Sequence, residues 1–193
     1  MDVVYVIDTS TGMSRQDIQQ LKPYLINAVN EFKISDKDVR IGFVLNNGRG
    51  SQDGSQDVVF LDLDKGSSKD DVKIFIQNIR KLDTPRDLVS ALKFADSSRF
   101  RVPRKNGEKA ELVTFVVAKQ PFPVEALKNA VVSLSNKPDK LVFVGSGTNM
   151  PDDVTIGDLK VKVVNLDSTH DIPDIYPIIF KVLATTKGAL LIT

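Results

Sequence analysis

The sequence contains no cysteine, and its one histidine is His170. Without cysteine the chain can form no disulfide bond, no thiolate metal site and no cysteine nucleophile. One histidine cannot build a multi-histidine zinc site, and alone it supports no catalytic role. There is also no Asn-x-Ser/Thr acceptor, so no N-glycosylation is expected. These absences do not assign a compartment, because a module of a secreted protein can also lack cysteine.

An excess of charge of one sign and long apolar runs are missing as well. The chain carries 26 basic and 25 acidic residues, a net charge of +1, whereas a dedicated nucleic-acid-binding domain shows a basic excess. No apolar run approaches the roughly 20 residues that cross a bilayer, and the first residues do not resemble a signal peptide. We therefore expect neither a nucleic-acid partner nor membrane insertion.

Length and hydrophobic content suit one folded unit. The 193 residues fall in the range of an ordinary domain, and 41% of them are hydrophobic, which is enough for a core. The chain shows no internal repeat, no linker-like segment and no low-complexity tract. We therefore expect a single domain over residues 1–193, as a module of a larger protein.

Two kinds of apolar pattern alternate along the chain. Short apolar runs rich in β-branched residues predict six strands, at residues 3–7, 39–45, 57–63, 111–118, 140–147 and 161–166. Apolar residues at steps of three or four predict helices with apolar faces over residues 18–32, 72–82, 124–134 and 175–183, and a further helix within 83–95.

The order of these elements predicts the fold class. Strands that alternate with helices form a mainly parallel sheet with helices on both faces. One connection differs, because the polar loop 46–56 joins the second and third strands without a helix. The third strand is therefore expected to be antiparallel and at an edge. The prediction is an α/β fold of the Rossmann-like, doubly wound kind, with a six-stranded sheet and one antiparallel edge strand.

Several motifs occur in an order that resembles a known family. The first strand ends in Asp8-x-Ser10, the second reads Val-Arg-Ile-Gly-Phe-Val at 39–44, and a late strand reads Val-Phe-Val-Gly-Ser-Gly at 142–147. Together with the segment 93–117, these motifs resemble von Willebrand factor type A domains. They are most similar to those of matrix proteins such as type VI collagen and the matrilins. The resemblance covers almost the whole chain in element order.

The resemblance implies a divalent-cation site at the carboxyl ends of the parallel strands. In that family the ion, often magnesium, is held by oxygen atoms from three loops. The first loop supplies Asp-x-Ser-x-Ser, the second a threonine, and the third an aspartate of a Thr-Asp-Gly turn. A carboxylate of the partner protein completes the coordination shell. Hard cations prefer such oxygen ligands, and magnesium requires nearly octahedral geometry.

Carried over residue by residue, this ligand set is incomplete. Asp8 and Ser10 match the first loop, and Thr84 is the threonine of the second. Gly12 replaces the second serine, and Lys119 stands where the aspartate belongs. An ammonium group ~5 Å from a dication repels it by roughly 6 to 7 kcal/mol at an effective dielectric of ~20. The site is therefore expected to be degenerate, and no resident cofactor is expected.

Three alternatives follow for these residues. The Lys119 amine could point at Asp8 and stand in for the ion. Asp8 and Ser10 could instead be plain turn residues whose side chains accept hydrogen bonds from the backbone that follows. Asp87 could supply a carboxylate from the second loop, in which case an intact, magnesium-dependent adhesion site remains.

The sequence predicts a non-catalytic protein-binding, adhesion or matrix-assembly module. No Walker motif, no dinucleotide-binding glycine pattern and no G-x-S-x-G motif occurs, so an enzyme is not expected. The expected partner is a matrix protein such as a collagen, or a second copy of the chain. The basic residues between Arg99 and Lys109 make a polyanion a further candidate. The expected location is the extracellular matrix after secretion, with a cytoplasmic scaffold in a protein complex as the alternative.

Overall fold

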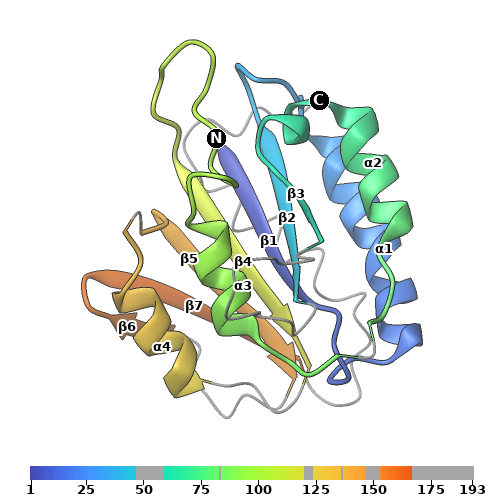
Figure 1. Ribbon diagram of the computed structural model, residues 1–193, viewed down its shortest axis with the longest axis vertical. Coiled ribbons are helices and arrows are strands. Elements are labelled where there is room, and N and C mark those ends of the chain that lie inside the picture. The colour runs from blue at the N-terminus through green and yellow to red at the C-terminus, as the bar shows by residue number, and fades with distance from the viewer. Residues whose placement is uncertain (47–58, 83, 120–123, 136, 147–152, 167–193) are drawn as a thin grey trace.

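A seven-stranded sheet forms the centre of the computed structural model, which describes residues 1–46, 59–82, 84–119, 124–135, 137–146 and 153–166 (Figure 1). The strand order across the sheet is β3-β2-β1-β4-β5-β7-β6. The strands are β1 Asp2–Asp8, β2 Arg40–Asn46, β3 Phe60–Leu61, β4 Leu112–Ala118, β5 Lys140–Ser146, β6 Asp153–Ile156 and β7 Leu159–Leu166.

The central strand β1 is buried along its whole length. It pairs in parallel with β2 on one side and with β4 on the other, so that Val4 lies beside Gly42 and Thr114. Tyr5 faces one hydrophobic core, whereas Val4 and Val6 face the other. Because both faces of the sheet are covered, β1 shows a continuous apolar run without polar alternation.

Helices cover both faces of this sheet (Figure 1). The helices α1 (Arg15–Glu31) and α2 (Lys69–Asn78) contribute to one core, and α3 (Leu88–Ala95) and α4 (Val124–Val132) to the other. A single 3-10 turn, η1 (Lys65–Ser67), precedes α2. None of the described helices is both long and apolar enough to cross a membrane.

Side chains at the starts of the helices explain where they begin. At α1, the Asp17 amide donates to Ser14 Oγ at 3.1 Å and the Ser14 amide donates to Asp17 Oδ2 at 2.8 Å, which is a complete capping box. Ser68 caps α2 by accepting from the Asp71 amide at 3.3 Å, as that Ser-x-x-Asp spacing suggests. Asp87 caps α3 in the same way, through the Ser90 amide at 3.0 Å.

The predicted α/β class, with a mainly parallel sheet and helices on both faces, is confirmed. The strand count differs, because β6 pairs antiparallel with β7 and adds a second antiparallel edge. The two-residue turn between them contains Gly157 at a φ of 60°, a conformation that glycine adopts without strain. β3 is antiparallel as predicted but spans two described residues only. The predicted helix 175–183 and residues 47–56 of the polar loop lie outside the described residues.

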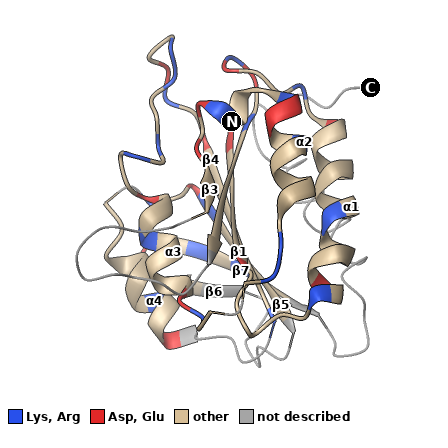
Figure 2. Cartoon of the chain, turned by 45° about the vertical axis from the view of Figure 1, so that its right-hand side comes forward, with Lys and Arg blue, Asp and Glu red and all other residues tan. Residues whose placement is uncertain are grey.

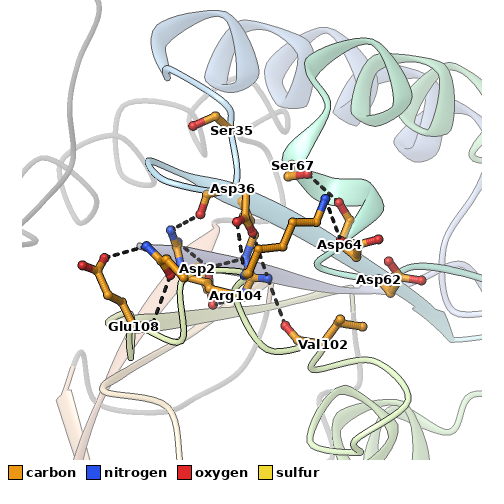
Figure 3. Close-up of polar contacts among 12 residues, drawn as sticks. Asp2, Ser35, Asp36, Asp62, Asp64, Ser67, Val102, Arg104 and Glu108 are labelled. Carbon is orange, nitrogen blue, oxygen red and sulfur yellow. Dashed lines mark hydrogen bonds and ion pairs between the residues drawn. The ribbon is translucent and has the colours of Figure 1, made fainter.

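Buried charged residues hold together the end of the sheet at which β1 and β2 begin (Figure 3). Arg40 donates through Nε and Nη2 to the two Asp2 carboxylate oxygens at 3.0 and 2.7 Å, and Arg104 Nη2 donates to Asp2 Oδ1 at 2.7 Å. Arg104 also donates to the carbonyls of Met1 at 2.8 Å and Asp38 at 3.1 Å. Burial raises the pKa of Asp2, but the two guanidinium groups outweigh burial and hold that pKa below its usual value.

We expect Asp2→Asn to lower the free energy of unfolding by about 3 to 5 kcal/mol at neutral pH, because it removes the carboxylate charge that two buried guanidinium groups share. Urea denaturation followed by circular dichroism measures the loss. The matched control is Glu125→Gln, which removes an exposed ion pair with Lys128 and should change stability by less than ~1 kcal/mol.

The same variant tests the direction of the pKa shift. The pKa of Asp2 is lower in the folded state than in the unfolded chain. Its stabilising contribution is therefore present above the unfolded value of about 3.9 and is lost as the pH falls through the folded value. The stability difference between wild type and Asp2→Asn should shrink when the pH is lowered below about 4. An undiminished difference at about pH 2 would contradict this assignment.

Candidate functional site

Three loops meet at the carboxyl ends of the parallel strands, where open α/β sheets place their ligands. The first loop is 9–14, after β1; the second is 84–87, before α3; and the third begins at Lys119, after β4. Backbone hydrogen bonds join the first loop to the second loop and to the residues just before it. The Leu82 amide donates to the Thr9 carbonyl at 2.6 Å, and the Thr11 amide donates to the Thr84 carbonyl at 3.1 Å.

Asp8, the last residue of β1, has a completely buried side chain. The amide and the hydroxyl of Ser10 donate to Asp8 Oδ1 at 2.9 and 2.5 Å. The Gly12 amide in turn donates to Ser10 Oγ at 3.1 Å. The hydrogen bonds expected of Asp8 and Ser10 as turn residues are therefore present, and one Asp8 oxygen is used within the first loop.

The second Asp8 oxygen faces an arginine. Arg86 Nε lies 2.6 Å from Asp8 Oδ2, and the Arg86 side chain is 15% exposed. Arg86 Nη2 also donates a hydrogen bond to the Lys119 carbonyl. One guanidinium group thus connects the second loop with the first and the third.

Gly12 provides the space for this guanidinium. A Cβ atom added at Gly12 would lie 1.9 Å from Arg86 Nη2, far inside contact distance. The backbone of Gly12 is not in the positive-φ region that favours glycine. The lack of a side chain at this position therefore leaves room for the guanidinium where it lies, and the backbone conformation does not require glycine.

The hypothesis that the Lys119 amine points at Asp8 is wrong. Lys119 Nζ lies 2.9 Å from Asp17 Oδ1, at the start of α1. Burial raises the pKa of Asp17, but hydrogen bonds from Lys119 and Ser14 outweigh burial and hold that pKa below its usual value. Lys119 thereby attaches the third loop to the first turn of α1.

The remaining candidate ligands lie in the second loop. Thr84 is beside the first loop, and its Oγ1 is buried without a hydrogen-bond partner among the described residues. The Asp87 carboxylate, considered as a substitute ligand, accepts the Ser90 amide as the cap of α3. Within the described part of the chain, no three carboxylates or histidines gather as they do around a metal ion.

Arg86 was missed by the sequence analysis, although a signal was present. The family pattern has a side-chain oxygen where Gly12 stands, and an arginine follows two residues after Thr84. A position without the expected oxygen and a nearby arginine, both expected at the same edge of the sheet, were the signal that these residues lie close together.

The basic segment 99–109 does not form one free surface. Arg104 is buried in the network around Asp2, and Arg101 is largely buried with its guanidinium 3.6 Å from Asp96. Lys105 and Lys109 are exposed. Figure 2 shows acidic and basic residues spread over the described elements, in keeping with the balanced net charge.

Solved structures with the same fold include proximal thread matrix protein 1 from the mussel byssus, at 14% identity and a TM-score of 0.65. The match covers 94% of this chain and 46% of that protein, so the chain spans less than half of its length. Another crystal structure of the byssus protein, described as having a zinc-occupied MIDAS motif, is 16% identical over 94% of this chain and 45% of that one, with a TM-score of 0.62.

The von Willebrand factor type A domain of SpRpn10 aligns with 100% of this chain and 98% of its own, at 13% identity and a TM-score of 0.56. At these identities the likeness shows the fold alone. No curated protein matches the sequence. A family model, described as von Willebrand factor type A domain, matches residues 2–156. The chain therefore belongs to the von Willebrand factor type A domain family, whose members are in general protein-interaction modules.

Proposed function

We propose that the chain, as one domain over residues 1–193, is a non-catalytic protein-binding module of the extracellular-matrix type, and that its binding does not require a divalent cation. The proposal that binding requires no divalent cation rests on the ion pair between Arg86 and Asp8. The matrix assignment is supported by the similarity of the second strand to matrix-type domains and by the shared fold of a byssus matrix protein.

The donor set at the three loops argues against a resident dication. Both Asp8 oxygens are already engaged, by Ser10 and by Arg86. Gly12 has no oxygen to offer. A dication bound to Asp8 would lie ~5 Å from the Arg86 guanidinium and be repelled by roughly 6 to 7 kcal/mol at an effective dielectric of ~20. Asp8, Ser10 and Thr84 thus remain from a ligand set that has lost its function.

Recognition in this proposal uses direct protein contacts at the rim of the three loops. The described part of that rim presents the exposed residues Thr11 and Ser14 to Gln16. The partner is a matrix protein such as a collagen, or a second copy of the chain. A polyanion partner is left with the exposed Arg99, Lys105 and Lys109 of segment 99–109, because Arg104 is committed to Asp2. An intracellular scaffold is the alternative, and the full-length gene product distinguishes the two by the presence or absence of a signal peptide.

Isothermal titration of the domain with magnesium or manganese should give no binding heat at cation concentrations up to about 1 mM, since the Asp8 carboxylate is already paired. Binding to immobilised fibrillar collagen, measured by surface plasmon resonance, should be the same in EDTA and in magnesium. Micromolar cation binding, or loss of collagen binding on chelation, would support an intact adhesion site instead. Absence of collagen binding in both buffers would contradict collagen as the partner.

A further inference from the structure

The guanidinium of Arg86 makes the connections that an ion shared by three loops would make. It extends from the second loop, lies 2.6 Å from Asp8 of the first, and donates to the carbonyl of Lys119 in the third. We propose that Arg86 is a built-in replacement for the cation, which holds the three loops in one arrangement and closes a latent divalent-cation site. This inference rests on the proposed cation-independent function.

The charges around Arg86 are consistent with such a replacement. Asp8 is completely buried, and a buried carboxylate without a positive partner is strongly unfavourable. Arg86 supplies one positive charge in contact with this carboxylate. A dication beside a single carboxylate would leave a surplus positive charge that another anion must balance. With Arg86 this surplus does not arise, so no further carboxylate is needed from the third loop or from a partner.

The third loop contributes a second pair of opposite charges. Lys119, which replaces the expected aspartate, is paired with Asp17 at 2.9 Å. Two contact pairs therefore join these loops to one another and to the start of α1, Arg86 with Asp8 and Lys119 with Asp17. Both pairs join segments that are distant in sequence, and neither depends on the concentration of a free ion.

Gly12 and Arg86 act as one unit because they use the same space. A Cβ at Gly12 would lie 1.9 Å from Nη2 and 2.6 Å from Cζ of Arg86. The end of an arginine side chain can usually move aside, but here such a movement separates the guanidinium from Asp8 and from the Lys119 carbonyl. A serine at position 12 and the observed Arg86 conformation are therefore mutually exclusive. Any side chain at position 12 should have the same consequence as removal of the guanidinium.

The first test is a double-mutant cycle in thermal unfolding with Gly12→Ala, Arg86→Ala and the combination. Each single change should lower the Tm by about 5 °C or more, because each removes the cation from Asp8. The combination should be no worse than Arg86→Ala alone, because the added methyl group then meets no guanidinium. Thr11→Ala, a substitution of an exposed residue in the same loop, is the control. Its change in Tm should add to the loss of Tm caused by Arg86→Ala. Additive losses for Gly12→Ala and Arg86→Ala would overturn the proposal.

The second test reopens the site with Gly12→Ser, Arg86→Ala and Lys119→Asp in one chain. Folded protein of this kind should bind manganese in a calorimetric titration, and ~10 mM manganese should raise its Tm by about 3 °C while leaving wild type unchanged. A folded triple variant that binds no manganese would overturn the latent site. If the triple variant does not fold, the double-mutant cycle decides. Manganese binding by the wild-type protein would refute the proposed function itself. Additive losses in the double-mutant cycle, with a wild-type protein that binds no manganese, would refute the role of Arg86 alone.

Discussion

Each end of the central strand β1 carries a buried carboxylate, and each of these needs a positive charge in contact with it. At the start of β1, Asp2 is held by Arg40 and Arg104, and at its end Asp8 is held by Arg86. A strand covered on both faces offers its terminal carboxylates little water, so an unpaired charge there would be very costly. The surrounding loops are positioned to a large extent by this requirement.

At the carboxyl end the source of the positive charge decides how the domain can work. A cation from solution makes binding responsive to ion concentration and leaves coordination positions for a partner. An arginine provides the charge permanently and joins the loops without an open position. In the proposed function, Arg86 on Asp8 and Lys119 on Asp17 make the rim a preorganised surface and not an ion-controlled one. Preorganisation of this kind reduces the ordering cost when a partner binds.

Much of the fold could be predicted because it depends on local patterns. The apolar run of β1 and the three-to-four spacing in α1 both appear in the structure where they were expected. The strand β6 was missed because its sequence, Asp-Val-Thr-Ile, is too short to show a period. It is stabilised by its pairing with β7 through the turn at Gly157, a tertiary feature.

The sequence by itself determined the order of the elements, and it predicted an incomplete ligand set, since Gly12 has no side-chain oxygen and Lys119 adds a cation. Only the tertiary structure decided which cation meets which carboxylate. Local periodicity cannot show that Arg86 reaches Asp8 while Lys119 reaches Asp17, because these contacts form across loops that the packed sheet brings together. The reason is geometric: ion pairing depends on distances of a few ångströms, and between remote segments these are defined by packing alone.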